Sequence, residues 1–354
     1  MRILIKGAGD LATGIAVMLY REGHDIVMTE IEVPLTVRRT VAFSRAVYEG
    51  EAIVEGIRGV RTDSGDGAEK IIADGQIAVI VDEKAKILKE YHPDILVDAV
   101  MAKKNLGTDI ADAPCVIGVG PGFTAGEDCH CVVETVRGES MGNLIFDGSA
   151  LPDTGIPGKV GGYTKERLLR AESDGKMVPR KDIGDYVQKG QVVAETGGVP
   201  VFAQITGIVR GMLQKDVIVR KGMKIGDIHP GTDVQCCFHI SDKAEKIGKG
   251  VCEAVEFLMR KDYGIVLLAA GKGERFGGEK LLYPVGTKPM YSHILQKMKV
   301  FPAVWKGIVT GHPQIERDAQ NMGVCVVANK FPEKGISYSV QEGLRRCLQD
   351  CPKI

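Results

Sequence analysis

Short continuous apolar runs, separated by glycine-containing turns and amphipathic stretches, dominate the first 120 residues of the chain. Such runs are typical of parallel strands buried on both faces, and the stretches between them have the periodicity of helices. The alternation of strand and helix predicts an α/β fold with a doubly wound sheet, which we assign to residues 1–150. The predicted strands are Arg2–Lys6, Asp25–Thr29, Ala78–Val81, Ile95–Ala99 and Cys115–Val119.

From about Gly155 to Gly231 the pattern changes to short strands between glycines, and we assign residues 151–260 to a second, β-rich domain. The segments Ile183–Gly190 and Val219–Asp227 resemble the two halves of the barrel-sandwich modules found in biotinyl and lipoyl carriers. No Met-Lys-Met or Asp-Lys-Ala stands at the expected hairpin tip, so covalent carriage of a cofactor is not expected. The predicted strands are Asp185–Val193, Val199–Ala203, Gly207–Met212 and Asp216–Val219.

The end of the β-rich domain carries two further expectations. Cys236 and Cys237 are expected in a strand, where adjacent side chains face opposite sides. A helix is predicted from about Ile240 to Arg260, with Ser241 or Asp242 as its N-cap, and it links this domain to the rest of the chain.

The turn after the first strand reads Gly7-Ala8-Gly9-Asp10-Leu11-Ala12 and leads into a helix predicted to end near Arg21. This is a G-x-G-x-x-A turn, and Glu30 follows about 20 residues later, as in the dinucleotide sites of Rossmann-like domains. The glycines let a pyrophosphate approach the main chain, and a carboxylate can accept a ribose hydroxyl. We predict that an adenine dinucleotide or a pterin nucleotide binds here, through Gly7, Gly9, Asp10 and Glu30.

Two later stretches also follow predicted strands, where the ligand crevices of such sheets open. The first is residues 98–103, and the second is the glycine-rich loop of residues 118–128. We predict Lys103, Gly120 and Gly122 as further cofactor contacts.

The sequence Cys129-His130-Cys131 has two interpretations. It is either a soft-metal or sulfur-handling site, or a pair of small strand residues on either side of an exposed histidine. A zinc site needs a fourth ligand, and none stands nearby in the sequence. We therefore expect this stretch to hold no metal.

A third pattern begins near residue 264, where the apolar run Ile265–Leu268 leads into a loop with four glycines and three basic residues. Glycines let main-chain N–H groups crowd around an anion, and basic side chains neutralise its charge, so the loop predicts binding of a nucleoside triphosphate. It lacks the G-x-x-x-x-G-K-[ST] order of a Walker loop. An ordinary strand–loop–helix corner is the alternative interpretation of the glycines alone.

The residues after this run resemble the signature of the molybdenum-cofactor nucleotidyltransferases, in particular the cytidylyltransferases. The run Gly335–Ser339, followed by Gly343, is similar to the base- and ribose-side loop of that family. The resemblance covers residues 263–354, in a third domain that we assign to residues 261–354, and implies CTP and Mg²⁺ as cofactors. The nucleotide contacts that it implies are Ala269, Ala270, Gly271, Arg275, Lys280, Asn329, Ser337 and Ser339.

In that family a metal-binding aspartate lies after the strand that follows a helix predicted here at about residues 337–348. The sequence ends at Ile354, before such a strand, so we expect the third domain to be the N-terminal portion of a nucleotidyltransferase domain. Nucleotidyl transfer needs a divalent cation to offset developing charge. We therefore expect nucleotide binding, expect no catalysis from this portion alone, and assign no catalytic residue.

The composition narrows the classes of partner. Lys+Arg and Asp+Glu are both 46 among 354 residues, so no overall field draws the chain to nucleic acid or to an anionic membrane. No apolar stretch approaches the roughly 20 residues of a membrane span, and the N-terminus lacks a signal-peptide pattern. The nine cysteines form no C-x-x-C pair, and their odd, scattered number favours a reducing cytoplasm.

A further resemblance rests on four segments of the chain, Gly7–Gly14, Val37–Arg39, Gly120–Gly126 and Ser241–Ala244. Through these segments the first 260 residues resemble the YqeB family of accessory proteins for selenium-dependent molybdenum hydroxylases. The N-terminal part is also similar to chaperones that insert matured cofactor into xanthine dehydrogenases. The resemblance implies that the chain delivers the molybdenum cofactor, or handles its sulfur or selenium, with an apo-hydroxylase as partner.

Three functions remain open at this point. The first is a molybdenum-cofactor maturation factor that acts as a monomer or a homodimer. The second is an NAD-dependent oxidoreductase that uses the N-terminal fingerprint, although no acid–base pair is placed for hydride transfer. The third is a non-catalytic scaffold that docks a hydroxylase and its cofactor.

Overall fold

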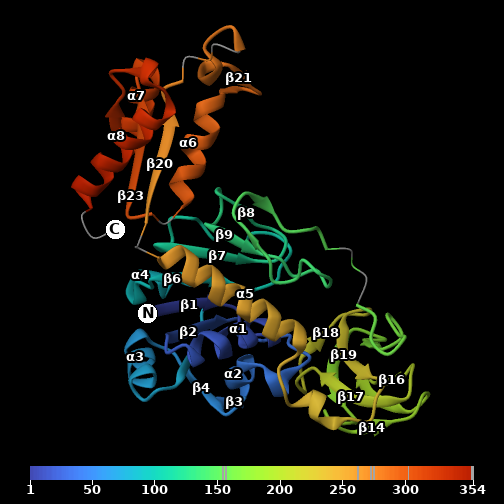
Figure 1. The fold of residues 1–354 in the computed structure, drawn as a ribbon. Helices are drawn as coiled ribbons and strands as arrows, with labels where there is room; N and C mark the ends of the chain where they lie inside the picture. The colour runs from blue at the N-terminus through green and yellow to red at the C-terminus, as the bar shows by residue number, and fades with distance from the viewer. Residues whose placement is uncertain are drawn as a thin grey trace. The chain divides into compact units, whose positions relative to one another are not determined.

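The computed structural model describes residues 1–153, 155, 158–260, 263–271, 273, 276–301 and 303–351, the side chains of 299 and 300 excepted. The chain forms two compact units, residues 1–255 and residues 256–354, which are described separately below (Figure 1). Among the described helices, none is both long enough and apolar enough to cross a membrane.

A nine-stranded sheet organises the first unit, in the order β10-β9-β7-β6-β1-β2-β5-β4-β3. The neighbours from β9 to β4 all run parallel, and only the two edge strands, β10 and β3, are antiparallel to their neighbours. The predicted mixed α/β class, with a large sheet of mainly parallel strands, is confirmed. The strands are β1 (Arg2–Lys6), β2 (Asp25–Glu30), β3 (Glu51–Val54), β4 (Ile57–Thr62), β5 (Ile77–Val81), β6 (Ile95–Asp98), β7 (Cys115–Val119), β9 (Cys131–Val133) and β10 (Leu144–Ile145).

The central strands consist mainly of apolar residues, and these residues are buried. Ile3, Leu4 and Ile5 of β1 are completely buried, because helices and loops cover both faces of the sheet. A small two-stranded sheet of β8 (Thr124–Ala125) and β11 (Gly148–Ser149) lies beside it. The helical segments of this part are α1 (Asp10–Arg21), η1 (Arg39–Val41), η2 (Phe43–Arg45), α2 (Ala46–Glu49), α3 (Gly65–Ala73) and α4 (Leu88–Tyr91).

Helix α5 (Asp242–Met259) returns to this sheet from the β-rich part of the chain and packs against α1. The crossing is close, since a Cβ on Gly14 of α1 would lie 2.6 Å from the Cβ of Ala244. Ser241 is the N-cap, because its hydroxyl accepts a hydrogen bond from the Ala244 N–H at 3.1 Å. This packing fixes where the first turn of α5 lies.

The β-rich segment (residues 168–229) consists of two four-stranded antiparallel sheets that share one apolar core. The expectation of a single strand at Asp185–Val193 is wrong, because a turn closed by the Gln191 N–H and the Gln188 carbonyl divides it. One sheet contains β12 (Leu168–Arg170), β19 (Lys224–His229), β17 (Gly207–Met212) and β14 (Tyr186–Val187). The other contains β16 (Val199–Phe202), β15 (Val192–Thr196), β13 (Gly175–Pro179) and β18 (Ile218–Val219).

The two adjacent cysteines do not lie in a strand, so that expectation is also wrong. They end a 3₁₀ helix, η3 (Val234–Cys237), which Asp233 caps by accepting a hydrogen bond from the Gln235 N–H at 3.0 Å. Local capping of this kind competes with strand formation.

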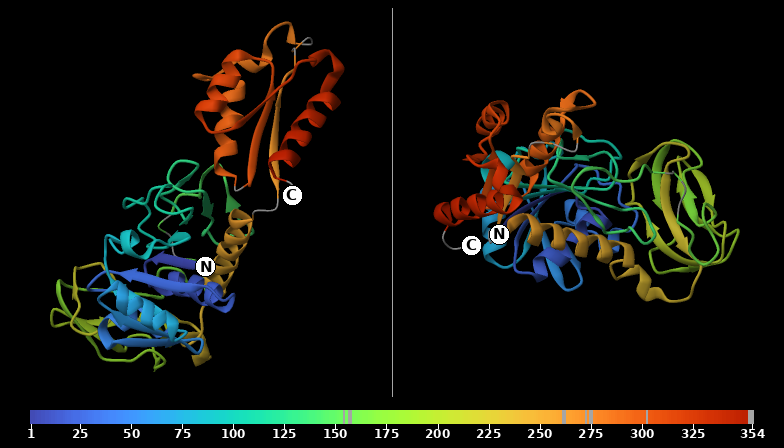
Figure 2. Two further views of the ribbon diagram at one scale, coloured as in Figure 1. Left: turned by 90° about the vertical axis from the view of Figure 1, so that its left-hand side faces the viewer. Right: turned by 45° about the horizontal axis from the view of Figure 1, so that its top comes forward.

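The second unit has a parallel three-stranded sheet in the order β20-β23-β24, with helices on both faces (Figure 2). Helices α6 and α7 pack on one face, through Leu295 and Ile315, and α8 packs on the other through Cys347. The predicted helix at residues 337–348 is confirmed as part of α8. The elements are β20 (Gly264–Ala269), η5 (Lys280–Leu282), β21 (Pro284–Val285), β22 (Lys288–Pro289), α6 (Met290–Val300), β23 (Trp305–Thr310), α7 (Pro313–Asn321), β24 (Cys325–Ala328), η6 (Pro332–Lys334) and α8 (Gly335–Asp350).

Candidate functional site

A cavity of about 500 Å³, here called the first cavity, opens at the carboxyl ends of β1, β2 and β6. The chain runs from β1 outward to β2 on one side and later returns to place β6 on the other side. Sheets of this kind bind ligands at such a reversal point. Lys6, Glu30 and Ala99 line the cavity from the three strand ends.

The glycine turn between β1 and α1 forms one wall. Gly7 has a φ of +93°, and a Cβ there would lie 3.1 Å from the Ala99 carbonyl oxygen, so a side chain would crowd the end of β6. Gly9 is the N-cap of α1, and Asp10 is its first residue. The first turn of a helix presents unpaired N–H groups and the positive end of the helix dipole, which favour an anion.

Glu30 closes this turn from the end of β2. Its carboxylate accepts hydrogen bonds from the Ala8 N–H at 3.0 Å and from the Ile31 N–H at 2.8 Å. Burial raises the pKa of Glu30, and these two main-chain bonds only partly counter that effect. The structure therefore brings the predicted contacts Gly7, Gly9, Asp10 and Glu30 together around one cavity.

Lys6 lines the first cavity, but a buried network already engages its ammonium group. Its Nζ lies 3.2 Å from an oxygen of Asp98 and 2.5 Å from the Thr108 hydroxyl, which itself donates to Asp98 at 2.6 Å. The ammonium is thus already neutralised, and we do not count it among the groups available for an anion.

Basic side chains that the sequence did not predict face the glycine turn from the β-rich segment. Arg167, Arg210 and Lys224 all line the first cavity, together with Arg38 from the loop after β2. Burial and the two arginines lower the pKa of Lys224. No local motif marks these three residues, since each lies more than 130 positions from the turn that it faces.

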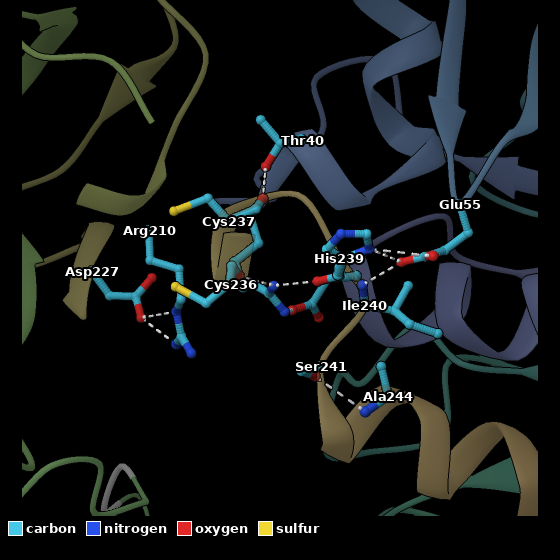
Figure 3. A network of polar contacts seen from close by, with 12 residues as sticks. Thr40, Glu55, Arg210, Asp227, Cys236, Cys237, His239, Ile240, Ser241 and Ala244 are labelled. Atoms are coloured by element: carbon cyan, nitrogen blue, oxygen red, sulfur yellow. Dashed lines mark hydrogen bonds and ion pairs between the residues drawn. The ribbon is translucent and has the colours of Figure 1, made fainter. Parts of the chain in front are cut away.

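The fully buried carboxylate of Asp227 holds the two arginines of the β-rich segment in place. It bonds Arg167 at 2.9 Å and also pairs with Arg210, whose guanidinium faces it in Figure 3. Only one oxygen of Asp227 makes these bonds. One acid thus orients two cations toward the cavity.

The linker between β19 and α5 is held against the large sheet by its main chain. The Arg38 guanidinium donates to the carbonyls of Cys236 and His239, at 3.1 Å and 3.0 Å. Figure 3 shows the neighbouring contacts, in which the Thr40 hydroxyl donates to the Cys237 carbonyl at 2.6 Å and the Ile240 N–H donates to Glu55 at 2.9 Å. Arg38 also lies 3.3 Å from Asp10, so it connects the linker to the glycine turn.

The other three predicted cofactor contacts do not join the first cavity. Lys103 lies in a second cavity of about 480 Å³, where its ammonium is 2.5 Å from Asp153. Gly120 and Gly122 have φ values of +78° and +114°, and a Cβ on Gly122 would lie 2.6 Å from the main-chain nitrogen of Lys104. They allow two loops to pack closely, and Met101 lies between the cavities and lines both.

The stretch Cys129-His130-Cys131 lies in the sheet layer rather than in either cavity. Burial raises the pKa of both thiols to about 12, and the Val116 N–H donates to Nδ1 of His130 at 3.0 Å. Within the part of the chain that the structure describes, no group of three His, Cys, Asp or Glu side chains could hold a metal ion.

In the second unit, the predicted phosphate loop follows β20. Ala269 is buried at the end of the strand, Gly271 is exposed, and Lys280 is exposed at the start of η5. Ala270 lies between the first two, and Arg275 lies outside the described residues. The described part of the loop thus leaves Lys280 accessible to a ligand.

The other predicted nucleotide contacts divide into two kinds. Asn329 and Ser339 are buried and bond each other, Nδ2 to Oγ, at 2.9 Å, and Asn329 also accepts from the Phe331 N–H at 3.0 Å. Ser337 is exposed on the first turn of α8. The first pair anchors α8 to the end of β24, whereas Ser337 is accessible.

Known proteins resemble this chain over two lengths. Over 259 residues, or 73% of its length, the chain is 44% identical to the uncharacterized protein YqeB of Escherichia coli K12, and it covers 48% of that protein. Residues 264–352 match the MobA-like NTP transferase domain. The chain is thus similar to YqeB over most of its length, and its C-terminal part matches a MobA-like NTP transferase domain. It spans about half the length of YqeB.

Two shorter similarities accompany this one. A probable molybdenum cofactor guanylyltransferase of Thermococcus sibiricus is 32% identical over 66 residues, which are 19% of this chain and 34% of that protein. A bifunctional protein GlmU of Rhizorhabdus wittichii is 34% identical over 87 residues, 23% of this chain and 19% of that protein. Together with the domain match, the similarity to the guanylyltransferase supports a nucleotidyltransferase-like C-terminal domain.

Proposed function

We propose that this chain is a maturation factor for the molybdenum cofactor of a molybdenum hydroxylase, with selenium-dependent hydroxylases as the expected clients. The first cavity binds the cofactor, which is a pterin that carries a phosphate group. The MobA-like domain binds CTP. One observation carries the proposal: a glycine turn, the start of α1 and four basic side chains, Arg38, Arg167, Arg210 and Lys224, all line a single cavity.

The chemistry of the first cavity suits a phosphorylated ring system. Main-chain N–H groups and guanidinium groups are strong donors to phosphate oxygens. Met101, Leu35 and Leu106 supply apolar surface on which a flat ring can lie. A cavity of about 500 Å³ falls within the range of small-molecule sites.

For the MobA-like domain we propose nucleotide binding and derive no transfer step. Mg²⁺ usually serves such reactions by bridging phosphates and one or two carboxylates. The described residues offer no cluster of three metal-binding side chains. Lys280 and the predicted contact Arg275 would neutralise the triphosphate.

An adenine dinucleotide is the second candidate ligand of the first cavity, and the position of Glu30 favours it. In dinucleotide sites an acid at this strand end accepts a ribose hydroxyl. Here both carboxylate oxygens already accept main-chain hydrogen bonds, so a ribose would have to use their remaining lone pairs. A redox role or a purely scaffolding role would follow if a nicotinamide dinucleotide or no ligand binds.

Binding of the cofactor tests the main proposal. The full chain is incubated without oxygen with molybdenum cofactor, separated by gel filtration, and assayed for bound pterin by fluorescence after oxidation. We expect about one pterin per chain in the wild type and little in Arg210→Ala, with NADH unable to displace it. Equal pterin retention by both proteins would contradict the proposal, and displacement by NADH would favour the dinucleotide.

Titration with CTP tests the second domain separately. Lys280→Ala and Arg275→Ala should each weaken CTP binding by roughly 1.5–3 kcal/mol, the value of a charge-assisted hydrogen bond. Lys288→Ala is the matched control, because Lys288 is an exposed lysine in the hairpin β21–β22. The proposal fails if the control loses as much affinity as the loop variants.

A further inference from the structure

The second cavity lies on the other side of Met101 from the first, and several elements of the first unit meet there. It has a volume of about 480 Å³ and is closed by loops after β6, β7 and β9 and by the first turn of α5. Its basic lining residues are Lys103, Arg137 and Lys243, and Asp153 is its acidic lining residue. Positive charge therefore predominates in its walls.

The main chain around this cavity is held by a buried acid. One oxygen of Glu134 accepts from the N–H groups of Thr135 and Val136, at 2.6 Å and 2.8 Å, and the other accepts from Leu151 at 2.8 Å. All three of these residues line the cavity. A single carboxylate thus fixes two separate segments of the wall, so the cavity has a defined shape.

The backbone beside the basic residues is strained. Met101 and Lys103 have φ values of +62° and +63°, in the left-handed region that residues with side chains rarely adopt. Strain of this kind costs about 1–3 kcal/mol per residue and persists where the surroundings impose it, often at binding sites. In this loop after β6, the two strained residues are Met101, which lines both cavities, and Lys103, which lines the second.

One of the three basic residues stands where a positive charge is unfavourable. Lys243 lies in the first turn of α5, at the positive end of the helix dipole, and Arg137 is close enough to lower its pKa further, after burial. The acidic partners of the other two cations offer little compensation. The pairs Lys103–Asp153 and Arg137–Asp242 are both partly exposed, and exposed pairs contribute about 0–1 kcal/mol.

We propose that the second cavity is a binding site for a phosphate-class oxyanion, held by Lys243, Arg137 and Lys103. A multivalent anion would replace the weak pairs with Asp153 and Asp242 and would relieve the repulsion between Lys243 and Arg137. The site goes beyond the function proposed above and does not depend on it, because none of its three cations lines the first cavity.

Two sources of the oxyanion share this chemistry. It is either a separate phosphate or phosphorylated molecule, or the far phosphate of a ligand that begins in the first cavity and passes Met101. The variants below distinguish them.

The test uses inorganic phosphate and the full-length chain carrying Gly9→Val, which narrows the first cavity. Calorimetry should show phosphate binding in this background, weakened at least about tenfold by Lys243→Ala and by Arg137→Gln. Lys249→Ala is the matched control, because Lys249 lies on the same helix, is exposed and pairs with Glu245 at 2.6 Å. If Gly9→Val does not fold, Gly9→Ala replaces it.

A second readout separates binding from structure. Without phosphate, Lys243→Ala should melt at the same temperature as its parent or higher, since it removes an unfavourable charge. The proposal is overturned if phosphate affinity is unchanged in Lys243→Ala, or if Lys249→Ala loses as much. In the otherwise wild-type chain, pterin binding weakened by Lys243→Ala identifies the oxyanion as part of a spanning ligand, and unchanged pterin binding identifies it as a separate molecule.

Discussion

The Asp227 carboxylate lies 2.9 Å from Arg167 and also bonds Arg210, and it is fully buried between them. Burial alone would raise the pKa of Asp227, but Arg210, Lys224 and Arg167 together hold it below its usual value of about 3.8. A carboxyl whose pKa is lowered by folding stabilises the protein above its unfolded pKa and loses that contribution as the pH falls through the folded pKa.

Asp227→Asn should therefore lower the free energy of unfolding by about 3–5 kcal/mol, because it leaves two partly buried arginines without an acid. Urea unfolding at pH 7 measures the loss. Glu195→Gln is the control, since it breaks the exposed pair with Arg180 and should cost no more than about 1 kcal/mol. The difference between wild type and Asp227→Asn should narrow only below about pH 3.8. A loss of stability similar to that of the control would show that Asp227 does not hold Arg167 and Arg210 in place.

Gly7 and Gly9 should respond differently to the same added methyl group. Gly7→Ala should destabilise the fold by about 1–3 kcal/mol, because φ is +93° and the Cβ would approach the Ala99 carbonyl. Gly9 has a φ of −67° and its Cβ would meet only Thr36, at 3.5 Å, so Gly9→Ala should fold normally and lose affinity for a ligand of the first cavity. Urea unfolding and pterin retention measure the two effects. Equal stability of the two variants would contradict this account.

The glycine turn could be predicted because its residues are contiguous and follow an apolar strand, so the local pattern carries the geometry. Glu30 could be predicted from its spacing alone. The basic wall could not, because Arg167, Arg210 and Lys224 reach the turn only through the docking of the β-rich segment. These three residues belong to no local sequence motif. Asp227, the buried acid that orients the two arginines, is a single residue and forms no motif either.

Ser339 and Ser337 were both predicted as nucleotide contacts, but their alanine variants should differ in stability. Ser339→Ala should destabilise the second unit by about 1–3 kcal/mol, because it leaves the buried Asn329 amide without its acceptor. Ser337→Ala should leave stability within about 0.5 kcal/mol, since that side chain is exposed. Thermal unfolding of the full chain, followed by Trp305 fluorescence, measures both. The assignment of Ser339 to an anchoring role fails if the two variants are equally stable.

Glu30 should give the stability a pH dependence opposite to that of Asp227. Its pKa is raised in the folded state, so the ionised form costs stability above the folded pKa, and this cost is relieved as the pH falls toward the usual value of about 4.5. Wild type should gain stability relative to Glu30→Gln as the pH is lowered from 7 to about 4.5. Urea unfolding across this range measures the difference, and a constant difference would contradict the burial of this carboxylate.

The vicinal cysteines show where local sequence misled the prediction and what signal was available. A strand was expected here, yet Asp233, a residue type that favours caps and turns, stands three positions before Cys236. Its carboxylate starts η3 instead. Lys103, Gly120 and Gly122 also follow strands as predicted, but tertiary contacts place Lys103 in the second cavity and set the two glycines where loops pack closely.

Much of the attachment of the linker after β19 uses main-chain atoms, which every amino acid possesses. Arg38 and Thr40 contact the carbonyl oxygens of Cys236, Cys237 and His239, not their side chains. A randomised library at positions 236 and 239 should therefore yield many folded members, whereas a library at 38 and 40 should yield few. In the course of evolution this main-chain attachment can persist through Arg38, Thr40 and Glu55 while linker side chains change, although His239 also pairs with Glu55 through its ring.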